Sequence, residues 1–216
     1  MTSRVGLVLA SASPARLTTL RRAGVRPSVV VSGVDEDAVL AAAERRSGPL
    51  DPEDVALLLA RAKCEAVAVD QHGTLVLGCD SVLELDGKSY GKPADPEQAV
   101  QRWGLMRGRS GILHSGHWLR DERDLDAGGT AATLGATAST TVHFADLTDE
   151  EIAAYVATGE PLDVAGAFTV DGLGGAFVTG IEGDHHNVVG LSLPLLRELL
   201  GEIGLQWWDV ASPDGP

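Results

Sequence analysis

The segment at residues 11–16, S-A-S-P-A-R, combines two hydroxyls and a guanidinium just after a short apolar run. Pro14 marks the first turn of a predicted helix, whose N-terminal N–H groups and positive dipole end suit an anionic phosphate. Ser11, Ser13 and Arg16 are therefore candidate phosphate ligands. The alternative is that Ser13 is an ordinary N-cap and Arg16 a solvated side chain.

Carboxylates at two places could bind a metal or accept a proton. Asp80, in the segment G-C-D-S at 78–81, falls at the end of an apolar run where Asp is disfavoured, so it must be solvated, paired or bound to metal. At a cleft it could hold a divalent ion or take a proton from water. The acids at 35–37 could give oxygen ligands to a hard cation. The alternatives are a turn aspartate and a chance cluster.

Lysine is rare in this chain, occurring only as Lys63, Lys88 and Lys92. Lys92, in G-K-P between a predicted hairpin and a helix cap, could pair with a phosphate as a point charge, or be an ordinary surface lysine.

The glycines at 159–175 indicate tight turns or close approach to a ligand, without dinucleotide or P-loop spacing. Four histidines are interpreted as structural or surface residues: His114, His117, His185 and His186.

The composition indicates a globular protein whose net charge disfavours binding to polyanions. The 216 residues, 44% hydrophobic and 22% charged, suit one domain or two small lobes. The 17 basic and 31 acidic residues give a net charge of −14, which disfavours nucleic acid and anionic membranes as partners. Two cysteines without C-x-x-C spacing favour a reducing cytosol. The apolar run V-G-L-V-L-A is too short for a signal peptide and indicates a buried strand.

The elements that would position these residues alternate along the chain. Helix signals predict five helices, at about 13–24, 51–69, 95–108, 148–159 and 194–204. Strand patterns predict Val5–Ala10, Thr74–Leu85, Lys88–Tyr90 after an Asp86-Gly87 turn, Ile112–Leu119, Thr137–Phe144 and Ala176–Ile181. The charged segment 121–129 is predicted as an exposed hairpin loop, and the end of the chain from Ser212 as frayed. The fold class is therefore α/β with a mixed sheet and flanking helices.

In their order these segments resemble the Maf family of nucleoside triphosphate pyrophosphatases from about residue 7 to residue 200. The segment 11–16 looks like the S-x-S-P-x-R loop of that family, Asp35-Glu36 like its acidic pair, and Arg61-Ala62-Lys63 like its helix lysine. Residues 78–81 resemble the segment that carries the catalytic aspartate. Further matches are G-K-P at 91–93, G-E-P at 159–161, A-G at 165–166, G-L-G-G at 172–175 and N-V-V-G-L at 187–191.

The resemblance implies an elongated, two-lobed Maf/ITPase-like architecture with a central cleft, in one domain over residues 1–204 with a C-terminal tail at 205–216. It implies a cytoplasmic house-cleaning hydrolase, often a homodimer, that converts normal or modified nucleoside triphosphates to the monophosphate and pyrophosphate. Asp80 would be the general base and, with Glu36, would hold Mg²⁺ or Mn²⁺. Ser11, Ser13, Arg16, Lys63 and Lys92 would bind the phosphates.

Three positions depart from the pattern of relatives that prefer dTTP and UTP. Those carry S-P-R-R, Thr after the catalytic Asp, and Gln in the Gly-rich loop, where this chain has Ala15, Ser81 and Asp171. We interpret these three as specificity residues. The alternative function is a non-catalytic, nucleotide-sensing regulator of septum formation and cell division, but the retention of Asp80, Lys63 and Lys92 favours an enzyme.

Overall fold

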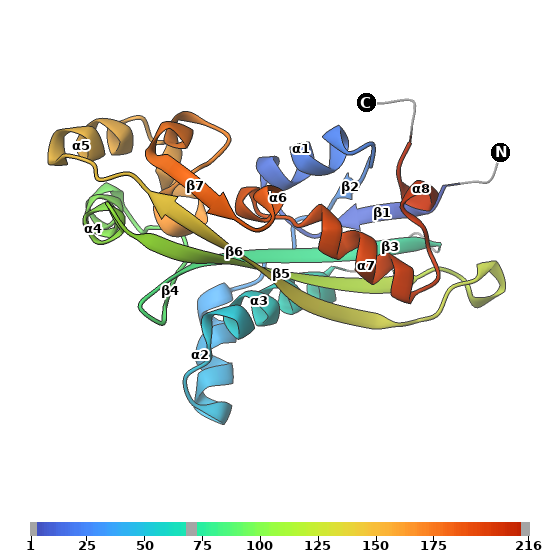
Figure 1. The fold of residues 1–216 in the computed structure, drawn as a ribbon. Coiled ribbons are helices and arrows are strands. Elements are labelled where there is room, and N and C mark those ends of the chain that lie inside the picture. The colour runs from blue at the N-terminus through green and yellow to red at the C-terminus, as the bar shows by residue number, and fades with distance from the viewer. Residues whose placement is uncertain (1–3, 68–72, 213–216) are drawn as a thin grey trace.

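A seven-stranded mixed sheet forms the centre of the protein in a computed structural model that describes residues 4–67 and 73–212 (Figure 1). Its strands are β1 (Gly6–Leu9), β2 (Ser28–Val29), β3 (Thr74–Leu85), β4 (Lys88–Tyr90), β5 (Ser110–Glu122), β6 (Thr133–Phe144) and β7 (Val178–Glu182). Its helices are α1 (Pro14–Arg22), α2 (Glu36–Ser47), α3 (Pro52–Ala66), α4 (Pro96–Met106), α5 (Asp149–Ala157), α6 (His185–Val189), α7 (Leu193–Glu202) and α8 (Trp207–Val210).

The sheet has the order β2-β1-β3-β5-β6-β7, with β4 also paired to β3. β1 is parallel to β2 and β3, and the other pairs are antiparallel. The prediction of a mixed sheet flanked by helices is confirmed. The molecule is elongated, with α1, α6 and α7 over one face of the sheet and α2 and α3 over the other (Figure 1).

Two main hydrophobic clusters lie towards opposite ends of the sheet. One joins β1, α1 and the start of β3 to α7 and α8, around fully buried Leu9, Leu77 and Leu196. The other surrounds Trp103 and joins α4 and α5 to the far ends of β3 and β6. Asp80 lies on β3 between these two clusters, so that packing at both ends holds its strand.

Helix α3 approaches the sheet closely because two glycines leave room for it. A Cβ on Gly78 would lie 2.2 Å from the Ala60 carbonyl oxygen, and one on Gly116 would lie 2.3 Å from that of Ala56. Since Gly116 pairs with Asp80 in the ladder, this contact brings the helix surface to the level of Asp80.

Local signals located most elements correctly, but the structure differs in several places. α3 ends at Ala66 rather than near residue 69, and 68–72 lie outside the described residues. β5 runs through Glu122, so Asp121, predicted in an exposed loop, is instead buried. Its carboxylate accepts hydrogen bonds from Arg123 and Thr130. Burial alone would raise the pKa of Asp121, but these hydrogen bonds hold it at about 2.

Three helices were not predicted. Only Ala43 of α2 is buried, so this helix has no apolar face packed on the core. It therefore lacks the helical repeat of apolar residues from which helices are predicted. α6 is only five residues long and includes His185 and His186.

The third unpredicted helix, α8, lies in the predicted C-terminal tail. There Val210 and Ala211 are buried, and the Ser212 N–H donates to the Gly24 carbonyl at 2.8 Å. The chain therefore packs on the core up to Ser212. Residues 213–216 lie outside the described residues, and the domain boundary at residue 204 stays a prediction.

None of the helices in the described ranges, 4–67 and 73–212, is both long and apolar enough to cross a membrane.

Candidate active site

The middle of β3 has an open edge on the side of β1. β1 pairs with Thr74–Leu77, and β4 pairs with Leu83–Leu85 on that same side, because β5 occupies the other side throughout. Residues 78–82 therefore have no strand partner there among the described residues. The loop after β1 borders this edge at one end and the segment after Tyr90 at the other. The open edge thus gathers three of the sequence segments predicted to carry the chemistry.

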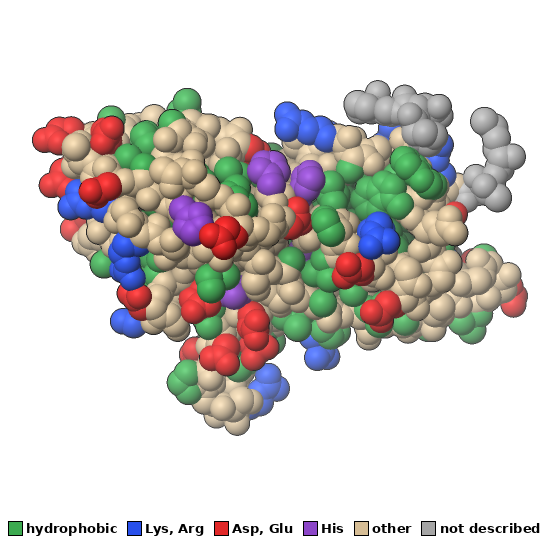
Figure 2. Space-filling view, in the orientation of Figure 1, with side chains coloured by type: hydrophobic (Ala, Val, Ile, Leu, Met, Phe, Trp, Pro, Cys, Tyr) green, Lys and Arg blue, Asp and Glu red, His purple; other side chains and the backbone are tan. Residues whose placement is uncertain are grey.

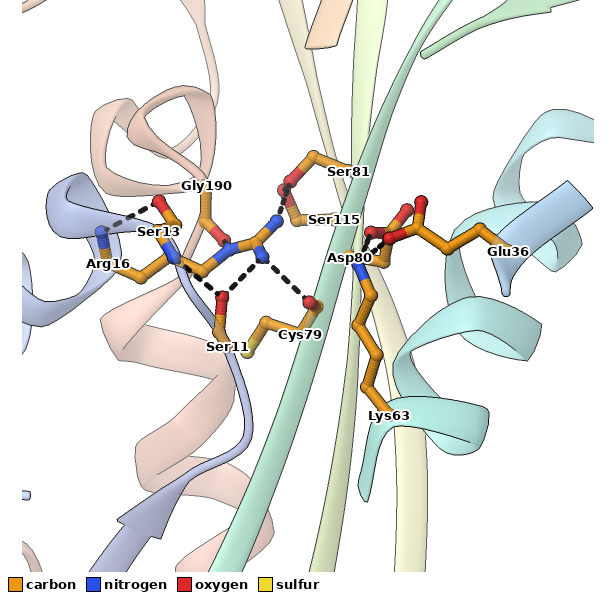
Figure 3. Close-up of polar contacts among 10 residues, drawn as sticks. All are labelled: Ser11, Ser13, Arg16, Glu36, Lys63, Cys79, Asp80, Ser81, Ser115 and Gly190. Carbon is orange, nitrogen blue, oxygen red and sulfur yellow. Dashed lines mark hydrogen bonds and ion pairs between the residues drawn. The ribbon is translucent and has the colours of Figure 1, made fainter. Parts of the chain in front are cut away.

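Arg16 lies on the α1 face of this edge, where its guanidinium donates to four acceptors of the protein (Figure 3). Nε donates to the Gly190 carbonyl at 2.8 Å, and Nη1 to the Cys79 carbonyl at 2.8 Å and Ser11 Oγ at 3.0 Å. Nη2 donates to Ser81 Oγ at 3.0 Å. Arg16 is only 8% exposed. It therefore joins α1, β3 and the end of α6, and few of its donors remain for a phosphate.

The two predicted hydroxyl ligands also serve the local fold. Ser13 is the N-cap of α1: its Oγ accepts from the Arg16 N–H at 3.4 Å and its carbonyl from the Leu17 N–H. Pro14 has no N–H, so few donors of the first turn are left for an anion. Ser11 Oγ accepts from the Ser13 N–H and from Arg16. The N-cap alternative for Ser13 is confirmed, whereas phosphate binding by either serine stays a prediction.

Asp80 points to the opposite face of β3, because successive side chains alternate along a strand (Figure 3). There it forms an ion pair with Lys63 of α3, and Lys63 Nζ also lies 2.7 Å from a carboxylate oxygen of Glu36, the first residue of α2. Asp80 is 7% exposed. Burial raises the pKa of Asp80, while the charges of Lys63 and Arg16 oppose that rise.

Glu36 and Asp80 fit the donor set of a hard divalent cation. Both carboxylates already face one cation, the ammonium of Lys63. Mg²⁺ is commonly held by one or two carboxylates and completed by water and substrate phosphates. In the part of the chain that the structure describes, no cluster of three or more His, Cys, Asp or Glu side chains could hold a metal ion. Water and oxygens from the substrate would therefore complete the coordination.

The remaining predicted residues lie at the margins of this centre. Lys92 is exposed and follows β4, which runs antiparallel to β3 with Tyr90 opposite Leu83. The chain after Tyr90 therefore continues towards the open edge. Ser81 lies at the centre, where its Oγ is 2.8 Å from Ser115 Oγ as well as bonded to Arg16.

Ala15 lies in the first turn of α1, and Asp171 lies beside the same helix. Asp171 lines a pocket of about 190 Å³ together with residues of α1, α6 and α7: Thr18, Thr19, Arg22, Ala23, His185, His186, Val189 and Leu193. Thr18 and Arg22 follow Ala15 by three and seven residues, so they share its helix face. Histidine side chains gather on the surface over α6 beside this pocket (Figure 2).

Ser115 was missed in the sequence analysis, and the contacts of the matched segment 187–191 were not predicted. Ser115 of β5 bonds both Ser81 and the Asn187 carbonyl, and the Gly190 carbonyl accepts from Arg16. No local pattern marks Ser115, which contacts residues 34 and 72 positions away. Buried His117 accepts from the Ser192 N–H at 2.9 Å, as expected of a structural histidine.

Comparisons with known proteins find relatives that match nearly the whole chain. A family model described as "Maf-like protein" matches residues 6–203. A Streptomyces coelicolor protein named "Nucleoside triphosphate pyrophosphatase" is 56% identical over 209 residues, covering 96% of this chain and 95% of the relative. A Salinispora tropica protein of the same name is 60% identical over 205 residues, covering 92% and 84%. Another from Leifsonia xyli is 53% identical over 208 residues, covering 94% and 95%.

Proposed function

The chain belongs to the Maf family, as its sequence motifs predicted, and from this premise we propose that it hydrolyses nucleoside triphosphates to the monophosphate and pyrophosphate. The observation that carries the proposal is the meeting of Asp80, Lys63 and Glu36 beside the open edge of β3. A cytoplasmic location and a homodimer stay predictions of the resemblance.

We assign the activation of water to Asp80. Cleavage between the α and β phosphates needs an oriented water, a proton acceptor and cationic partners for the polyphosphate. Lys63 contacts Oδ1 of Asp80, so we assign Oδ2 as the oxygen that takes the proton. As the water oxygen bonds to the α-phosphorus, the bond from that phosphorus to the bridging oxygen breaks and pyrophosphate leaves. The raised pKa of buried Asp80 makes it a stronger base than an exposed aspartate.

Lys63 and Lys92 are the cations that we propose to face the phosphates. Lys63 reaches Asp80 from α3, and Lys92 approaches the same edge from the segment after β4. Ser11 and Ser13 border the edge at the end of β1. Arg16 contributes its positive charge from the other face of β3, while its hydrogen bonds hold Ser11 and Ser81 in place.

Glu36 and Asp80 would hold a divalent cation, Mg²⁺ or Mn²⁺. When bound, such an ion would neutralise phosphate charge and polarise the phosphoryl oxygens. We expect EDTA to abolish pyrophosphate release and either ion to restore it. Glu36→Gln should raise the Mg²⁺ concentration that gives half-maximal activity and leave the preference among bases unchanged. A metal titration of both proteins at a fixed nucleotide concentration measures this, and full turnover after thorough chelation would contradict it.

The proposed function is tested by incubating the protein with canonical and modified nucleoside triphosphates and separating pyrophosphate from orthophosphate. We expect stoichiometric monophosphate and pyrophosphate. Release of orthophosphate alone, or of neither product from any nucleotide, would refute the proposal.

We predict that dTTP is not the preferred substrate. The glutamine that dTTP- and UTP-specific relatives carry can donate and accept hydrogen bonds, whereas ionised Asp171 only accepts. An acceptor complements the amino group of cytosine, or the N1–H and amino group of guanine. Values of kcat/KM for CTP, GTP and 7-methyl-GTP should therefore exceed that for dTTP, with UTP a weaker substrate. A dTTP optimum that persists in Asp171→Asn would rule out this role.

A further inference from the structure

Glu160 is a hydrogen-bond centre for which the sequence suggested no role. It follows α5 and begins a 3₁₀ helix, Glu160–Asp163. Its Oε1 accepts from the Gly174 N–H at 2.9 Å, from the Tyr155 hydroxyl at 3.1 Å and from the Thr169 hydroxyl. Its Oε2 accepts from the Leu173 N–H at 2.9 Å. One carboxylate therefore bonds the segment 169–174 at both of its ends.

Asp171 lies between the two points at which Glu160 holds this segment. Thr169 precedes it by two residues, and Leu173 and Gly174 follow it by two and three. The Thr169 N–H also donates to the Tyr155 hydroxyl at 3.2 Å, which itself bonds Glu160. The backbone on each side of Asp171 is thus attached to the same pair of side chains, Glu160 and Tyr155.

The glycines of this segment allow the carboxylate to come so close. A Cβ on Gly172 would lie 2.5 Å from Glu160 Oε2, and one on Gly174 would lie 2.3 Å from the Tyr155 hydroxyl oxygen. Contact with these two side chains therefore explains Gly172 and Gly174.

Asp171 itself is exposed and lines the pocket beside α1 and α6. The pocket has polar and aromatic walls, with Thr18 and Arg22 on one side and His185 and His186 on another. Whether Asp171 presents its carboxylate to this pocket depends on the path of residues 169–174, which Glu160 determines.

We propose that Glu160 is a positioning residue for nucleobase selectivity, which it sets by holding Asp171 at the wall of this pocket. The inference rests on the proposed function, because it concerns the base of the same substrate. Glu160 contacts neither Asp80 nor Lys63 in the described structure, so its action is on recognition of the base. Burial opposes ionisation of Glu160, but hydrogen bonds led by that of Thr169 lower its pKa, and the carboxylate therefore stays an acceptor for all four donors.

The test compares Glu160→Gln with wild type by kcat/KM over dTTP, UTP, CTP and GTP. The amide keeps the size but can accept at only one atom, so residues 169–174 lose part of their support. We expect the ratio of kcat/KM between the best and the worst nucleotide to fall by about fivefold or more. KM should rise for the best nucleotide, while kcat stays within about twofold. Glu151→Gln is the matched control, because Glu151 caps the other end of α5 and should leave the ratio unchanged.

A double mutant separates positioning from a merely structural role. In an Asp171→Ala background, Glu160→Gln should have no further effect on the selectivity ratio, because both changes act on the same contact. If Glu160→Gln fails to fold, Tyr155→Phe, which removes one donor to Glu160, carries the same expectation on a smaller scale.

Unchanged selectivity in a folded Glu160→Gln or Tyr155→Phe protein would overturn the inference and leave the proposed function intact. An effect of Glu160→Gln that persists in full without Asp171 would also overturn it. Lack of pyrophosphate release by the wild-type protein would refute the proposed function, and this inference with it.

Discussion

Asp80→Asn is expected to lower kcat by about 10²–10⁴ while nucleotide binding remains, since loss of a general base typically has an effect of this size. The substitution keeps the shape of the side chain and removes its ability to take a proton. Lys63 would lose one ionic partner, but Glu36 remains 2.7 Å from its Nζ, so its charge is not left unpaired. Pyrophosphate release under saturating nucleotide, with binding measured by calorimetry, gives the two quantities.

Asp86→Asn provides the matched control. Asp86 lies in the turn that follows the same strand, its side chain is exposed, and its φ of 53° suits asparagine at least as well as aspartate. We expect this variant to retain wild-type activity. A folded Asp80→Asn protein with full turnover would contradict the assignment of Asp80 as the base.

Local chemistry explains why much of the fold could be predicted. Asp95 caps α4 by accepting from the Gln98 N–H, and Thr148 and Glu151 form a capping box on α5. Asp86 and Gly87 both have positive φ, as a two-residue hairpin turn requires. Each of these features involves residues within four positions of one another, so the sequence shows them directly.

The three residues Asp80, Lys63 and Glu36 are brought together by contacts between parts of the chain that are distant in sequence. Their proximity could not be predicted from local patterns. Lys63 meets Asp80 because α3 packs onto Gly78, and Glu36 joins them from α2, a helix without an apolar period. The motif resemblance named all three residues but not the ion pairs among them. Their assignment to catalysis and metal binding stays a prediction.

Arg16 illustrates the same limit. In the sequence, the nearby hydroxyls of Ser11 and Ser13 suggest that Arg16 binds phosphate. The alternative is that Ser13 is an ordinary N-cap and Arg16 is solvated. The structure contradicts the solvated alternative, because the guanidinium is buried and turned towards β3 and Gly190. Phosphate binding by Arg16 stays a prediction. Only the fold brings Gly190, 174 residues away, within reach.

Arg16→Lys should therefore lower both the stability of the protein and its catalytic activity. A lysine presents its donors from one point and cannot bridge the Cys79 and Gly190 carbonyls as the planar guanidinium does. Leaving a buried acceptor unpaired costs about 1–3 kcal/mol, so with two such carbonyls we expect the free energy of unfolding to fall by about 2–6 kcal/mol. Displacement of Ser81, next to Asp80, should lower kcat in addition.

Urea unfolding with linear extrapolation measures the stability of Arg16→Lys, and Arg21→Lys on the exposed side of α1 is the control for the same change of side chain. The control should be unchanged in stability and in kcat. If Arg16→Lys were as stable as wild type and only KM rose, the guanidinium would be a phosphate ligand first, and its four hydrogen bonds would exchange for the substrate on binding. A loss of stability in the absence of nucleotide separates these roles, because a ligand to the substrate alone has no reason to stabilise the free protein.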